Sequence, residues 1–129
     1  MTIAQFNYCK KKKQFAKTRA EFIAMISEID PGELVDAWAL LQDYSFAAVR
    51  SLSGLTQDDF SSRYGIPPTT VRSWTLAETS ANRRNIQTYL LDLLAVDVIN
   101  VRAAEKNLKK LEKPIEKTHN TVQFTDDDE

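Results

Sequence analysis

The sequence predicts an all-α protein. The chain has 129 residues but only three glycines and four prolines, so residues that interrupt helices are sparse. Apolar residues recur at intervals of three and four along most of it, which is the spacing of one helix face. No segment alternates over the length of a strand. A chain of this length is one ordinary domain with extensions, large enough to bury a core without metal or disulfide bonds.

Residues 1–42 are predicted to be a helical extension that precedes the main domain. One apolar series at helical spacing consists of Phe15, Phe22, Ile26 and Ile29. It predicts a single amphipathic helix from about residue 8 to residue 29. A second helix is expected to start at Asp30, as N-cap, with Pro31 at its first position. The apolar side of that helix is formed by Leu34, Ala37, Trp38 and Leu41.

Residues 55–74 contain the most specific local pattern, two short helices separated by a glycine turn. Thr56 is placed to N-cap the first helix, and Gly65 can adopt the positive φ that follows a helix end. Pro68 suits the first position of the second helix, where its missing N–H costs nothing. The four residues expected to share one core are Phe60, Tyr64, Val71 and Trp74. A helix from Tyr44 to Ser53, ending at Gly54, is predicted to precede this corner.

Several stretches of this region occur in a recognisable order. They are Arg50-Ser51-Leu52-Ser53-Gly54-Leu55-Thr56-Gln57, Gly65-Ile66-Pro67, Thr70-Val71-Arg72-Ser73-Trp74 and Tyr89-Leu90-Leu91-Asp92-Leu93-Leu94. Together they resemble the Cro/repressor-type (XRE-like) helix-turn-helix DNA-binding family over about half of the chain. The resemblance implies a repressor-like five-helix helix-turn-helix domain at 43–100, whose recognition helix, residues 68–76, enters the major groove of DNA. After Trp74 the sequence departs from the family, because Thr75-Leu76-Ala77-Glu78 replaces the usual Glu-x-Gly.

The resemblance also implies a set of DNA-binding residues. Gln57 would approach the DNA backbone, and the residues facing base edges would be Pro68, Thr69, Arg72 and Ser73. Phosphate contacts are expected from Arg63, Arg83 and Arg84. The expected partner is therefore double-stranded DNA.

The end of the chain is predicted to extend the closing helix. That helix is defined by Ile86, Leu90, Leu93, Leu94 and Val98. A further apolar stripe, expected to end at Pro114, consists of Leu94, Val101, Ala104, Leu108 and Leu111. It is a candidate homodimer contact, or alternatively it receives the N-terminal helix through Phe15, Phe22 and Ile26. Either way Leu108 is expected to be partly covered, with 101–117 a C-terminal helical extension and 118–129 a disordered acidic tail.

Charge and cysteine content exclude several classes of protein. The formal net charge is −1, and the domain predicted to bind DNA is slightly acidic, whereas lysines occupy positions 10 to 13. Cys9 is the single cysteine, which fits a reducing cytoplasm and offers no zinc cluster, although its lysine neighbours favour a lowered thiol pKa. No apolar run reaches membrane-spanning length. We therefore expect no enzyme, no metal, no cofactor and no membrane partner.

Two functions remain open at the level of sequence. The first is a cytoplasmic, sequence-specific DNA-binding transcriptional regulator of bacterial or phage type. The second is a protein-interaction module, antitoxin-like or a phage accessory protein, that keeps the helix-turn-helix fold and holds a protein partner through its N-terminal helices. The second is supported by Pro68 and Thr69, which stand where bidentate base contacts would need Arg, Gln or Asn.

Overall fold

The computed structural model describes residues 1–76 and 85–122, with side chains through Lys110. The described residues form helices and no strand, which confirms the all-α prediction. In chain order the helices are α1 (Ile3–Lys13), α2 (Arg19–Met25), α3 (Pro31–Leu41), α4 (Phe46–Ser53), α5 (Gln57–Tyr64), α6 (Pro68–Thr75) and α7 (Thr88–Val122). Within these ranges no helix is both long enough and apolar enough to cross a membrane.

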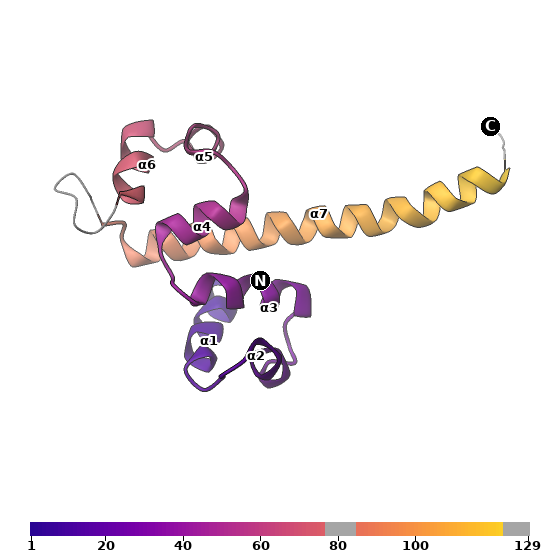
Figure 1. Cartoon of the computed structure of the whole chain (residues 1–129), viewed down its shortest axis with the longest axis horizontal. Helices are drawn as coiled ribbons and strands as arrows, with labels where there is room; N and C mark the ends of the chain where they lie inside the picture. Colours follow the sequence, from indigo (N-terminus) through magenta and orange to yellow (C-terminus); the bar gives the residue numbers. More distant parts are fainter. Residues whose placement is uncertain (77–84, 123–129) are drawn as a thin grey trace.

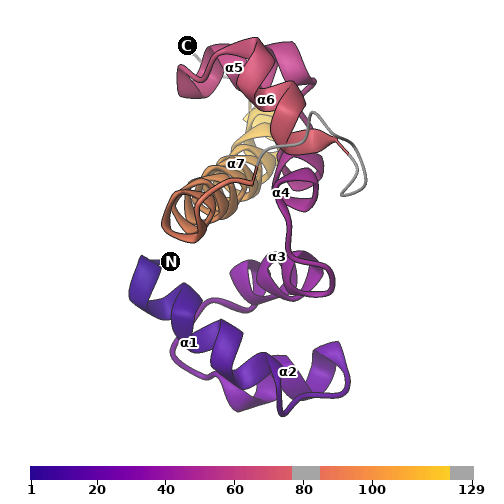
Figure 2. The ribbon, with the colours of Figure 1, turned by 90° about the vertical axis from the view of Figure 1, so that its left-hand side faces the viewer.

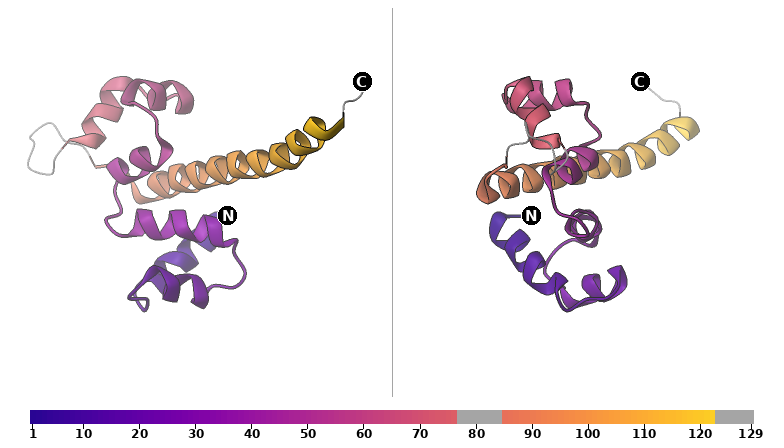
Figure 3. Two further views of the ribbon diagram at one scale, coloured as in Figure 1. Left: turned by 45° about the vertical axis from the view of Figure 1, so that its right-hand side comes forward. Right: turned by 60° about the vertical axis from the view of Figure 1, so that its left-hand side comes forward.

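The long helix α7 is the axis of the molecule. Helices α1, α2 and α3 lie on one side of it, and α5 and α6 lie on the other (Figures 1 and 2). Helix α4 runs beside α7 and contacts α3, α6 and α7, so it joins the two groups. The C-terminal half of α7 extends away from all other helices (Figure 3).

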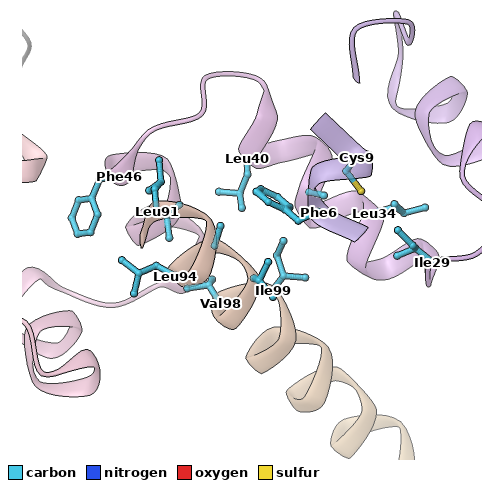
Figure 4. Packing of buried hydrophobic residues seen from close by; sticks show 14 of the residues in the cluster. Phe6, Cys9, Ile29, Leu34, Leu40, Phe46, Leu91, Leu94, Val98 and Ile99 are labelled. Carbon is cyan, nitrogen blue, oxygen red and sulfur yellow. The ribbon is translucent and has the colours of Figure 1, made fainter. Parts of the chain in front are cut away.

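One continuous hydrophobic core connects both groups through the first part of α7. Ala95 and Ile99 of α7 are fully buried, as are Phe6 of α1 and Leu34 of α3. Phe46 of α4 lies at the other end of the same core, near Leu91 and Leu94 (Figure 4). Because a single core spans the two groups, the N-terminal helices are an integral part of the fold.

The predicted helix over residues 8–29 is wrong, because the chain breaks there into α1 and α2. Thr18 and Glu21 form a reciprocal capping box: the Thr18 hydroxyl accepts from the Glu21 N–H at 3.2 Å, and the Glu21 carboxylate accepts from the Thr18 N–H at 3.2 Å. Such a box satisfies backbone donors that a helix start leaves unpaired. The apolar periodicity continues through the break, and the local cap decides the helix boundary.

The next two helix starts differ in how well the sequence predicted them. Asp30 caps α3 by accepting N–H bonds from Gly32 and Glu33, with Pro31 at the first position, as predicted. Helix α4 begins at Phe46, two residues after the predicted start, because Ser45 is its N-cap and accepts from the Ala48 N–H at 3.2 Å.

The predicted end of the last helix at Pro114 is also wrong. Helix α7 keeps helical backbone through this proline to Val122, so residues 118–122 belong to the helix, while 123–129 lie outside the described residues. Proline removes one backbone hydrogen bond, but its φ of about −65° is itself helical. The division into domains at residues 42, 100 and 117 stays a prediction.

The N-terminal helices do not dock on the apolar stripe of α7. Phe15 is 70% exposed and Leu108 is 60% exposed, whereas Phe22 packs against Trp38 with ring centroids 5.3 Å apart. Helix α1 contacts the first part of α7 instead, where Lys10 reaches Asp92. The expectation that Leu108 would be covered within one chain is therefore wrong.

Candidate nucleic-acid interface

Helices α5 and α6 form a tight corner whose geometry is set by short-range hydrogen bonds. Thr56 caps α5 by accepting from the Asp59 N–H at 3.1 Å. Gly65 ends that helix with a φ of +65°, a conformation that side chains with a Cβ disfavour. The buried Ser61 hydroxyl donates to the Ile66 carbonyl, and α6 begins at Pro68. The turn is thus held by α5.

The inner face of the corner is an aromatic and aliphatic cluster. Phe60 and Val71 are fully buried. Phe46 of α4 meets both the Phe60 ring and the Trp74 ring edge-on, each at a centroid distance of 5.3 Å. Tyr64 is half-buried with its ring 4.6 Å from that of Phe60. The four predicted core residues therefore all contribute to one core, with Tyr64 and Trp74 at its margin.

The outer face of α6 brings together three of the predicted DNA-binding residues. Pro68, Thr69 and Arg72 are exposed on this helix. Ser73 is half-buried and already has an interaction partner, so it is less available to a ligand. Gln57 is half-buried in the first turn of α5. Arg83 and Arg84 lie outside the described residues.

Arg63 lies in a different environment, between α5 and α7. Its guanidinium carbon is 5.8 Å from the centre of the Tyr64 ring, and it lines an open hollow with Leu93, Leu94 and Asp97. The Tyr64 hydroxyl donates to the Asp97 carboxylate at 2.8 Å. Burial, the larger cause, and this hydrogen bond, the second, raise the pKa of Tyr64 to about 12. Arg63 thus contacts the scaffold beneath the corner.

The electrostatic character of the corner is mixed. Arg72 is the single charged residue of α6, while Asp58 and Asp59 are exposed in the first turn of α5. Arg50 points inward, where its Nη1 donates to the Leu55 carbonyl at 3.2 Å. Local positive charge at this face therefore comes from Arg72 and from the partial charge at the α6 N-terminus.

Two buried acids were missed by sequence reasoning. Asp36 of α3 is only 4% exposed and pairs with Arg102 Nε at 3.0 Å, with Lys106 Nζ also 3.5 Å away. Asp92 of α7 accepts from Lys10 at 2.7 Å and from the Tyr44 hydroxyl at 2.6 Å. Their partners are distant in the chain, so no local pattern could have identified these pairs.

Cys9 does not have the lowered thiol pKa that its lysine neighbours favour. Its side chain is fully buried, and desolvation raises its thiol pKa to about 11. A buried protonated thiol is a poor nucleophile. Among the described residues, no three His, Cys, Asp or Glu side chains gather closely enough to hold a metal ion.

Comparison with known proteins gives no relative for this arrangement: no family model matches the chain, and no curated protein or solved structure matches it either.

Proposed function

We propose that this protein is a sequence-specific DNA-binding regulator that inserts α6 into the major groove of duplex DNA. The observation that carries the proposal is the two-sided character of α6. Val71 and Trp74 pack against the core and fix the rotation of α6 about its own axis. Pro68, Thr69 and Arg72 consequently face outward. A rigid, amphipathic helix that follows a tight turn suits entry into a groove wide enough for one helix.

Helix α5 has a supporting role in this proposal. Its first turn carries Gln57, an uncharged donor and acceptor suited to a phosphate oxygen. The Gly65 turn and the hydrogen bond from Ser61 to the Ile66 carbonyl fix α5 relative to α6, so both helices would meet the duplex as one unit. The five-helix repressor arrangement is part of the same proposal, since within 43–100 the described residues supply α4, α5, α6 and the beginning of α7.

A direct test is to select duplexes from a randomised library with the full chain and then measure their affinity. The enriched duplex should bind more tightly than a shuffled duplex of the same composition at each of two salt concentrations. Arg72→Ala should lose about 1–3 kcal/mol of that preference if the guanidinium reads a guanine. Arg63→Ala, which removes the same charge from the hollow between α5 and α7, serves as the matched control and should retain the preference. Failure to enrich any duplex would contradict the proposal.

The second candidate function, a protein-interaction module, is favoured by one specific observation. The exposed Asp58 and Asp59 stand in the first turn of α5, next to the face that would meet phosphates, and Arg72 alone offsets them on α6. Phosphate affinity depends on local positive charge. In this alternative the N-terminal helices hold a protein partner, and Arg72→Ala would leave every DNA measurement unchanged.

A further inference from the structure

We propose that the outer face of α1 is a second binding site, which takes single-stranded nucleic acid. The site consists of Tyr8, Lys11, Lys12 and Phe15, called here the α1 outer stripe. Their spacing of three, one and three places them on one side of a helix. Phe15 stands two residues beyond Lys13, the last residue of α1, but its N–H still donates to the Lys12 carbonyl at 3.0 Å, so the backbone makes one more tight turn there. The opposite side of α1 carries the fully buried Phe6 and Cys9.

The two aromatic rings of the stripe are exposed although their backbone is anchored. Phe15 is 70% exposed and Tyr8 is 37% exposed, while the next residue after Phe15, Ala16, is buried in the core. Exposed flat rings on a rigid backbone can stack on unpaired bases, and such stacking tolerates any base sequence. The bases of a duplex already stack on one another, so this feature favours a single strand.

The cations around the stripe favour a polyanion. Lys10 is neutralised by Asp92, and Lys13 lies 5.0 Å above the Trp38 ring. Lys12 lies 5.4 Å from the centre of the Tyr8 ring, so it covers one face of that ring and leaves Phe15 as the more exposed ring of the stripe. In the part of the chain that the structure describes, no carboxylate lies within ion-pair distance of Lys11, Lys12, Lys17 or Arg19. The nearby Glu21 carboxylate is occupied by the backbone N–H groups of Lys17 and Thr18.

The dimensions of the stripe fit a short segment of one strand. Tyr8 and Phe15 are seven residues apart, which is about 10 Å along a helix. A separation of this size lets one strand touch the whole stripe, with a base on Phe15 and its backbone beside Lys11 and Lys12. Because α7 separates α1 from α6 (Figures 1 and 2), a strand on the stripe would leave the outer face of α6 open. The site is therefore independent of the proposed duplex reader.

The test measures binding of the full chain to a fluorescent oligothymidylate of about 16 nucleotides, the upper size of one single-strand site. Phe15→Ala should weaken binding by about fivefold or more, since stacking on one base is lost. Lys11→Gln with Lys12→Gln should reduce the salt dependence of log K by about 1.4, the release of ions from two phosphates. The double variant Lys109→Gln with Lys110→Gln removes the same charge from exposed positions of α7 and should bind like wild type.

The outcomes separate this site from its competitors. Wild-type binding that depends on Phe15 and survives Arg72→Ala supports the proposal, even if no duplex is ever selected by α6. No binding to the oligothymidylate, or equal binding by wild type and Phe15→Ala, overturns it. Loss of the single-strand complex in Arg72→Ala also overturns it, since the strand would then lie on α6. So does Phe15-dependent binding to vesicles of phosphatidylcholine and phosphatidylserine without oligothymidylate binding, because the stripe would then face a membrane.

Discussion

At the scale of single residues, the structure depends on two acids buried where helices meet. The pair of Asp36 and Arg102 connects three helices. Arg102 of α7 donates to the Asp36 carboxylate of α3 and also to the Leu52 carbonyl of α4 at 3.2 Å. A buried carboxylate is costly unless it is paired and hydrogen-bonded. The sequence suggested only that position 36 falls within an apolar helix, since its partner lies 66 residues away. Pairs of this kind depend on the tertiary fold and cannot be predicted from spacing.

Arg102→Ala should therefore destabilise the protein. Removing the guanidinium leaves Asp36 with Lys106 alone and frees the Leu52 carbonyl, which should lower the free energy of unfolding by about 1.5–3 kcal/mol. Urea denaturation monitored by circular dichroism measures the change. Lys110→Ala, an exposed cation two turns further along α7, should stay within about 0.5 kcal/mol of wild type. Equal stability of the two variants would show that the Asp36 pair adds nothing.

Two tyrosines predict a loss of stability at high pH. The pKa of Tyr64 is raised to about 12, and burial with the Asp92 hydrogen bond also raises the pKa of Tyr44. Because each folded pKa exceeds the unfolded value of 10.0, the stabilising contribution is complete below pH 10 and is lost as the pH rises from 10 towards 12. Urea denaturation of wild type and of the double variant Tyr44→Phe, Tyr64→Phe is compared at pH 8 and above pH 10. The difference between their free energies of unfolding should be smaller at the higher pH. A gap that widens with pH would contradict this assignment.

At the scale of helices, local signals determined which boundaries were predictable. The α5 cap at Thr56, the turn at Gly65 and the α6 start at Pro68 were predicted and confirmed, because each depends on a residue's own backbone preference. The break between α1 and α2 carried a local signal as well, the Thr18-x-x-Glu21 capping box. The continuing apolar periodicity concealed it, so a cap should outweigh periodicity when the two disagree.

Helix α6 provides a paired test of structure and recognition. Trp74→Ala should lower the free energy of unfolding by about 3 kcal/mol, because the indole packs edge-on against Phe46 and its loss leaves a cavity. Arg72→Ala, two residues earlier and exposed, should change stability by less than about 0.5 kcal/mol while weakening any duplex preference. Thermal or urea unfolding of both variants checks this division. A stable Trp74→Ala protein would mean that the inner face of the corner has been assigned to the wrong residues.

At the scale of the whole molecule, the sequence predicted helices but not how they are arranged. In one of the two predicted arrangements the N-terminal helix covered the α7 stripe from Leu94 to Leu111. Helix α1 packs instead on the beginning of α7, through Phe6 and Lys10. The amphipathic pattern shows that a face is buried and does not show which partner covers it. This arrangement leaves the α1 outer stripe and the α6 outer face on opposite sides of α7, and it leaves the second half of α7 without a partner in the chain (Figure 3).

That projecting half of α7 makes a testable prediction about assembly. Leu94 is only 6% exposed within its own chain, so the stripe available to a second copy begins at Val101 and includes Ala104 and Leu108. A single helix without tertiary contacts is marginal in water, and pairing with a second copy would cover the 60% exposed Leu108. We expect sedimentation equilibrium to give a dimer for wild type and a folded monomer for Leu108→Glu. Lys109→Glu, which places a glutamate one position away and off the stripe, should remain dimeric, and a monomer at every concentration of wild type would exclude pairing through this helix.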